Sequence, residues 1–137
     1  MPLQRNKGVI MSGLVKIDVE KRFVYSAFSG RTDDQEFLQQ RSVIESHPDF
    51  DPSFSEIVDF SGVTGGEISN AALRNQAERE SIYQPTSKHV VVCPMDLYFG
   101  LARMFQVYAE HSRPNFTVMR SLSDAYVQLG LKPPTAE

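Results

Sequence analysis

Apolar and polar residues alternate along the first well-patterned part of the chain. The alternation covers residues 14–19 and 23–28, and the polar stretch 20–22 joins the two runs. A two-residue period is typical of strands that bury one face. We therefore expect an antiparallel hairpin over these residues.

Helical patterns follow the hairpin. The first predicted helix covers residues 33–46, with Thr32 as N-cap and Gln35 completing a capping box. Pro48 ends it, because the residue before a proline avoids helical backbone. A second helix, predicted over residues 67–80, has only a narrow apolar face and is expected at the surface.

The strongest amphipathic pattern lies in residues 97–111, where large apolar residues recur at helical spacing: Leu97, Leu101, Met104, Phe105 and Tyr108. Gly100 costs this helix about 1 kcal/mol relative to Ala, which close approach to the sheet or another helix would offset. The helix has more apolar residues than one buried stripe needs. Surplus apolar surface is typical of an interface, so we expect a homodimer through this helix.

Three further strands complete the pattern. Residues 56–60 and 116–119 are short apolar segments, and residues 89–93 form a continuous apolar run typical of a central strand. A last helix is expected over residues 121–130. The order predicts an α/β fold: a mixed β-sheet, with an N-terminal antiparallel hairpin plus parallel strands, covered by about four helices.

We expect one domain over residues 13–131. Residues 1–12 are predicted to be a flexible tail or an edge strand, and residues 132–137 a C-terminal tail. The sequence does not decide whether translation starts at Met1 or at Met11.

The amino-acid composition disfavours several classes of function. The chain of 137 residues has 14 basic and 17 acidic residues, and the basic ones form no run, which disfavours nucleic-acid binding. Cys93 is the only cysteine, so neither an internal disulfide nor a cysteine-based metal cluster forms. No stretch approaches the ~20 apolar residues of a membrane helix. A cytoplasmic protein without cofactor, metal or membrane insertion is expected.

Residues 55–72 are the first candidate site. A strand ends near Asp59, a small-residue loop with Gly62, Gly65 and Gly66 follows, and helix-starting residues come next. Backbone amides of such a loop can hold a phosphate, but the segment matches no P-loop or dinucleotide pattern. The other interpretation is a loop that needs positive φ values. No carboxylate or histidine is visibly paired with Asp59, which we expect to accept hydrogen bonds from loop amides.

The loops beyond the carboxyl ends of parallel strands are the usual crevice of such folds. They predict one docking surface for a ligand or a protein partner, built from the following residues: Asp59, Ser61, Gly65, Gly66, Ser69, Asp96, Tyr98 and Arg103.

Four motifs, in this order of elements, resemble the STAS-like superfamily, the fold of sulfate-transporter and anti-sigma-factor-antagonist domains. They are D-F-S-G-V at 59–63, V-V-V-C at 90–93, F-G-L-A-R-M-F at 99–105 and M-R-S-L-S-D-A-Y at 119–126. The resemblance covers residues 13–130 and is closest to the small stand-alone bacterial branch.

The resemblance implies a non-catalytic binding or regulatory module for a protein partner or a small apolar or anionic ligand. It also makes Ser69 a candidate phosphorylation site, because Ser69 aligns by spacing with the serine that a kinase modifies in the antagonist proteins. The Asp-Ser-Ser-Gly signature of those proteins is replaced here by E-I-S-N at 67–70. The alternative is a small enzyme, or a nucleotide- or phosphate-binding protein, that uses the Gly-rich loop.

Overall fold

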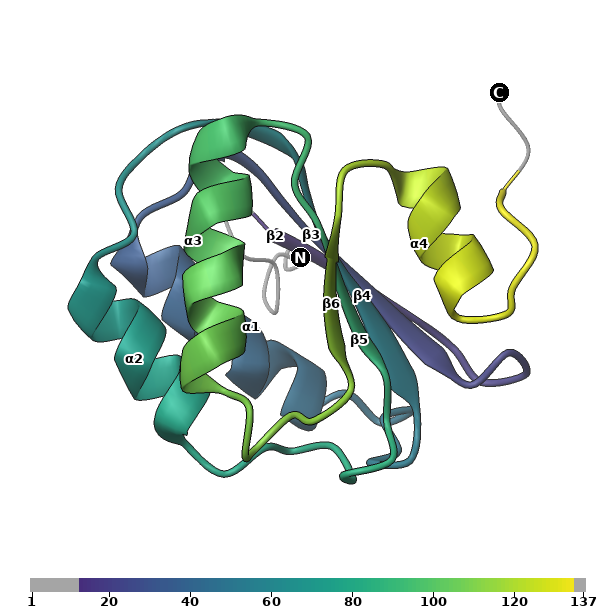
Figure 1. Cartoon of the computed structure of the whole chain (residues 1–137). Coiled ribbons are helices and arrows are strands. Elements are labelled where there is room, and N and C mark those ends of the chain that lie inside the picture. Colours follow the sequence, from purple (N-terminus) through teal and green to yellow (C-terminus); the bar gives the residue numbers. More distant parts are fainter. Residues whose placement is uncertain (1–12, 135–137) are drawn as a thin grey trace, which may run out of the picture.

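A five-stranded mixed sheet is the centre of the computed structural model, which describes residues 13–134 (Figure 1). The first strand is antiparallel to the second, and all later neighbours are parallel, as the sequence predicts. The strands lie side by side in chain order: β2 (Gly13–Asp18), β3 (Phe23–Arg31), β4 (Ser55–Gly65), β5 (His89–Val92) and β6 (Phe116–Met119).

Four helices cover this sheet in two unequal layers. On one face lie α1 (Asp34–Glu45), α2 (Asn70–Glu78) and α3 (Asp96–Tyr108), and each of them connects two neighbouring parallel strands. On the other face lies the short helix α4 (Leu122–Gln128), seen at the right of Figure 1. The predicted fold class is therefore confirmed.

The strand order has a consequence for where a ligand can bind. From β3 to β6 the order advances without reversal, and all three connecting helices lie on the same face. The crevice at the carboxyl ends of α/β sheets opens where the strand order reverses. This sheet has no such point, so its topology does not supply the crevice that the sequence analysis expected.

Alternation along the strands divides the core between the two faces. On β4, Phe60 packs towards the three-helix layer, whereas Ile57 packs with Phe23 and Val92 on the side of α4. The larger core cluster lies under α1, α2 and α3, and aromatic rings such as Phe28 and Phe60 (centroids 5.1 Å apart) fill much of it.

The segment predicted as a small-residue loop is instead the second half of a strand. β4 continues to Gly65 because β3 also continues to Arg31, and the two extensions pair with each other through shifts in register. Gly62 permits this pairing, since a Cβ there would lie 3.0 Å from Cβ of Ser29. The loop prediction was therefore wrong for residues 61–65, whereas Gly66 lies beyond the strand and has the positive φ that one interpretation expected.

Two helix starts also differ from expectation. Asp33, not Thr32, is the N-cap of α1, and its N–H donates to Oε1 of Glu36 (2.9 Å). Thr32 instead continues the pairing of β3 with β4, because its N–H donates to the carbonyl oxygen of Gly65 (3.0 Å). Helix α2 begins at Asn70 after its N-cap Ser69, three residues later than predicted.

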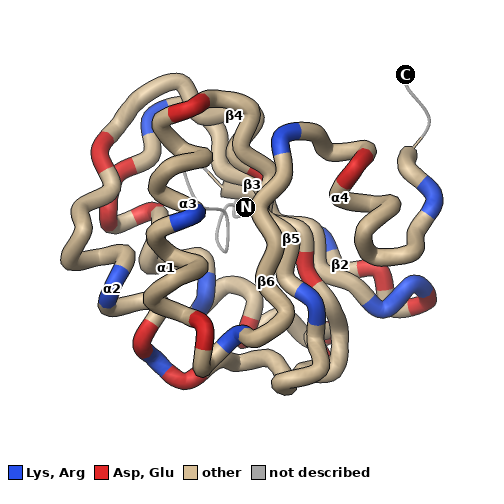
Figure 2. The backbone as a smooth tube through the Cα atoms, viewed as in Figure 1, with Lys and Arg blue, Asp and Glu red and all other residues tan. Residues whose placement is uncertain are grey.

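Charged residues of both signs are distributed along the described part of the chain. Figure 2 shows Lys and Arg interspersed with Asp and Glu over the fold. None of the helices in residues 13–134 has the length and apolar character needed to cross a lipid bilayer. The predicted N-terminal tail or edge strand, residues 1–12, lies outside the described residues.

Candidate functional site

A cavity of about 110 Å³ lies between the sheet and the layer formed by α1, α2 and α3. Alternate strand positions point into it, and the three helices close it from the other side. Most of its wall is apolar and largely aromatic: Phe28, Phe37, Phe60, Ile68, Leu73, Val91, Tyr98, Phe105 and Phe116. This composition is typical of a small-molecule pocket.

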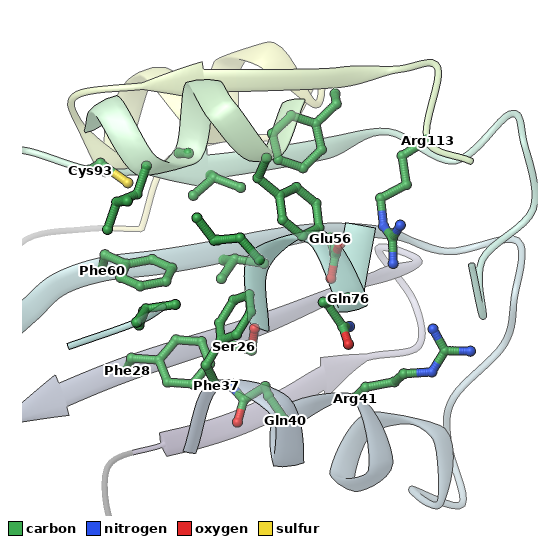
Figure 3. Close-up of a pocket in the computed structure, with 18 of the residues that line it drawn as sticks. Ser26, Phe28, Phe37, Gln40, Arg41, Glu56, Phe60, Gln76, Cys93 and Arg113 are labelled. Carbon is green, nitrogen blue, oxygen red and sulfur yellow. The ribbon is translucent and has the colours of Figure 1, made fainter. Parts of the chain in front are cut away.

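The polar side chains of the cavity are not spread evenly. Figure 3 shows Arg41, Glu56, Gln76 and Arg113 gathered at one end, opposite the apolar end with Phe60. The polar end lies near the start of β4, and it receives one side chain from α1, one from α2 and one from the segment after α3. The cavity is thus amphipathic along its length.

Several polar atoms of the cavity wall are buried without a hydrogen-bond partner among the described residues. Both amide atoms of Gln40 are in this state although the residue is only 5% exposed, and so is the hydroxyl of Ser26. Oε1 of Gln76 and both Nε and Nη1 of Arg41 are unpartnered as well. Each such group costs about 1–3 kcal/mol unless water or a ligand satisfies it, so this cavity is the candidate site of the fold.

A buried acid–base pair lies beside the polar end. Nδ1 of His89 is 2.7 Å from Oε2 of Glu56, and His89 is 1% exposed. Burial alone would raise the pKa of Glu56, but the hydrogen bond from His89 and nearby positive charge outweigh it and hold the pKa below its ordinary value. Burial and the negative charge of Glu56 raise the pKa of Tyr83 well above its ordinary value.

Cys93 lines the apolar end of the cavity (Figure 3). Burial, together with the negative charge of Asp59, raises the pKa of its thiol to about 12. The side chain therefore stays protonated at neutral pH and behaves as a small apolar residue, not as a nucleophile.

The structure does not bring the residues of the predicted docking surface together. Asp59 is buried on the α4 side of the sheet, where it accepts hydrogen bonds from the hydroxyl of Tyr25 (2.6 Å) and the N–H of Ser61 (2.9 Å). Tyr98 is buried on the opposite face and lines the cavity. Asp59 and Tyr98 are therefore separated by the sheet, and the structure does not bring these two residues into one surface.

Ser69 lies in a local network at the start of α2. Its hydroxyl donates to Oδ2 of Asp34 (2.7 Å) and accepts from the N–H of Ala72 (3.1 Å), while its own N–H donates to Oδ1 of Asp34. The N–H of Glu67 donates to Oδ1 of Asp33 (2.8 Å). These amides are satisfied by the protein's own carboxylates, which also repel a phosphate.

The remaining predicted residues lie apart from the cavity. Asp96 is exposed and pairs with Nη1 of Arg120 (2.7 Å), and Arg103 is exposed on α3. Gly65 ends β4, and Gly66 has a φ of +101° beside the backbone of Thr32. Of the predicted site residues, the cavity lining includes Tyr98 alone.

Sequence reasoning missed the polar end of the cavity. Gln76 and Arg113 gave no recognisable motif, since they come from two segments that meet only in the fold. One signal was present: Arg41 falls on the apolar side of its helix beside Phe37 and Ile44, where a solvated charge is not expected.

Comparison with known proteins identifies no family. No protein-family model matches the chain, and no curated protein matches it either. The resemblance to the STAS-like superfamily therefore stays a prediction from sequence motifs. Within residues 13–134, no group of three or more His, Cys, Asp or Glu side chains is arranged to hold a metal ion.

Proposed function

We propose that this chain is a small-molecule-binding module that holds a mainly apolar ligand in the cavity between the sheet and α1, α2 and α3, and carries out no reaction on it. The observation that carries the proposal is one cavity whose aromatic wall contains buried, unpartnered polar atoms. Binding to such a site satisfies polar groups that the protein alone leaves unpaired.

Two features favour binding over catalysis. The thiol of Cys93 is held protonated at the apolar end, away from the polar groups. Glu56, the acidic residue of the polar end, is already hydrogen-bonded to His89 inside the core. A regulatory role, as the STAS-like resemblance implies, would follow if occupancy of the cavity changes how α1 and α2 pack.

The alternative, a phosphate or nucleotide site at the Gly-rich segment, finds less support. That segment is strand as far as Gly65, and the amides of Glu67 and Ser69 already donate to Asp33 and Asp34. An incoming phosphate would have to displace two carboxylates of its own sign.

Binding of a neutral apolar probe tests the proposal. We expect 1-octanol to give saturable shifts in the amide NMR signals of β4, β5 and α3. Ala102 lines the cavity, and the variant Ala102→Phe should abolish these shifts because the larger side chain fills the space. The matched control is Ala71→Phe, an exposed position on α2 that leaves the cavity open.

The proposal is wrong if 1-octanol gives no saturable shifts with the unmodified protein. It is also wrong if Ala102→Phe, shown to be folded by circular dichroism, binds 1-octanol as well as the Ala71→Phe control.

We also propose that the module self-associates through the outer face of α3. Leu97, Met104 and Val107 lie on this face at helical spacing and are 62%, 40% and 66% exposed. A second copy would cover these side chains.

A further inference from the structure

We infer that the cavity selects a medium-sized organic carboxylate, with the anionic group at Arg41 and the apolar body against the aromatic wall. The inference rests on the proposed function and names the class of ligand.

The guanidinium of Arg41 supports an anionic ligand. Its Nε and Nη1 are buried without partners, and no Asp or Glu oxygen lies within 4.0 Å of it in the described part of the chain. Burial and the positive charge of Arg79 lower its pKa, although Glu45 and Glu80 act in the opposite direction. The residue as a whole is half-buried, but these two donors are shielded from solvent, so an anion in the cavity would pair with them.

Arg113 strengthens the positive character of the same end. Its Nη1 donates to the carbonyl oxygen of Ala77 (3.3 Å) and to Oγ of Ser112 (2.9 Å), which fixes the guanidinium in place. No carboxylate lies within 4.0 Å of it among the described residues. Figure 3 shows that Arg41 and Arg113 approach this end from opposite sides.

Glu56 is the only acidic side chain among the described residues that line the cavity. It attracts Arg113 electrostatically, but it forms no ion pair within 4.0 Å with either arginine. Its Oε2 is taken by His89 at 2.7 Å. The wall therefore offers two guanidinium groups against one carboxylate that already has a partner. That balance favours a single negative charge on the ligand.

The shape of the guanidinium favours a carboxylate as the anionic group. A planar carboxylate accepts from a guanidinium edge through both of its oxygens. The amide of Gln40 lines the cavity nearer Phe37 (Figure 3), where its unpartnered atoms would meet the body of the ligand.

The size of the cavity limits the body of the ligand. One water needs about 10–15 Å³ of such space, so a cavity of about 110 Å³ holds roughly seven to eleven waters. A ligand with a similar number of non-hydrogen atoms fits, and octanoate is within that range.

The test compares octanoate with octanamide, which has the same shape and no charge, by titration calorimetry. We expect octanoate to bind at least about tenfold more tightly, because it forms charge-assisted hydrogen bonds to the shielded Nε and Nη1 of Arg41. Arg41→Met should remove the difference, and Arg41→Lys should restore part of it. The matched control is Arg74→Met, because Arg74 is exposed on α2 and pairs with Glu78.

The outcomes separate this inference from the proposed function. Equal affinity for octanoate and octanamide overturns the inference but leaves an apolar binding module. A preference that survives in Arg41→Met overturns the role of Arg41. Tighter binding of octyl phosphate than of octanoate overturns the choice of carboxylate. Failure of all of these probes and of 1-octanol overturns the proposed function itself.

Discussion

Gly66 and Gly100 differ in whether their surroundings have room for a side chain. At Gly66, φ is +101° and a Cβ would lie 2.2 Å from the carbonyl oxygen of Thr32. At Gly100, within α3, a Cβ would meet nothing within 4 Å. The close packing that the sequence analysis expected around Gly100 is absent, so this glycine only weakens the helix.

These positions predict opposite effects of the same substitution. Gly66→Ala should lower the free energy of unfolding by at least about 1–3 kcal/mol through backbone strain. Gly100→Ala should raise it by about 1 kcal/mol through helix propensity. Urea denaturation measures both. An unchanged midpoint for Gly66→Ala would show that the turn relaxes without cost.

Glu56 gives the protein a pH dependence of known sign. Its pKa in the folded state is lower than the ordinary value of 4.5, so it stabilises the fold at pH values above 4.5. This stabilisation is lost as the pH falls below 4.5 through the folded-state pKa.

We expect Glu56→Gln to flatten the loss of thermal stability at acidic pH, as measured by melting temperatures over a pH series. Glu110→Gln, at an exposed position after α3, serves as control and should follow the unmodified protein. A Glu56→Gln profile parallel to that of the unmodified protein contradicts the assignment.

At the scale of elements, one contact ties the starts of two helices together. Asp34, the first residue of α1, accepts from both the N–H and the hydroxyl of Ser69, the N-cap of α2. The two helices form adjacent parts of the cavity wall. Their relative position therefore depends on this pair.

Ser69→Ala should cost about 1 kcal/mol, as loss of an N-cap usually does. Ser69→Glu should cost more, because a second carboxylate then faces Asp34. Chemical denaturation measures both changes, with Ser42→Ala on exposed α1 surface as control. If Ser69→Glu is as stable as the unmodified protein, the site tolerates negative charge and a phospho-switch at Ser69 becomes more credible.

The elements were predictable from sequence wherever local pattern and tertiary burial agree. The run at 89–93 is such a case, because β5 forms there and is buried. The helix predicted over residues 97–111 also forms, but α3 buries Tyr98, Ala102 and Phe105 and leaves Leu97 and Met104 of the predicted stripe exposed. The extension of β4 was not predictable locally, because Ser29 and Gly62 read as turn residues until the two segments pair. The cavity was harder still, since Gln40, Gln76 and Arg113 acquire a common environment only when three connecting helices lie on one face.

At the scale of the whole molecule, the two helical layers expose different amounts of apolar surface. The outer face of α3 carries Leu97, Met104 and Val107, whereas α4 exposes Val127. A group of apolar side chains along one helix is a better interface than a single residue.

We therefore expect light scattering at high micromolar concentration to give the mass of a dimer. Val107→Glu should shift it to a monomer, because a charge at the interface is left without water or a partner. Val127→Glu, 64% exposed on α4 before substitution, should remain a dimer. A monomer mass for the unmodified protein contradicts self-association.

The buried position of Cys93 makes its reactivity a measure of how often the protein opens. Cys93 is buried in the cavity wall, so a thiol reagent reaches it only when the protein opens locally, and the labelling rate measures how often that opening occurs. A ligand in the cavity should slow labelling in proportion to its occupancy, which mass spectrometry of the intact protein can follow. If labelling is equally fast with and without saturating ligand, the bound ligand does not restrict the opening that exposes Cys93. The labelling rate of this thiol therefore reports how often the cavity becomes accessible.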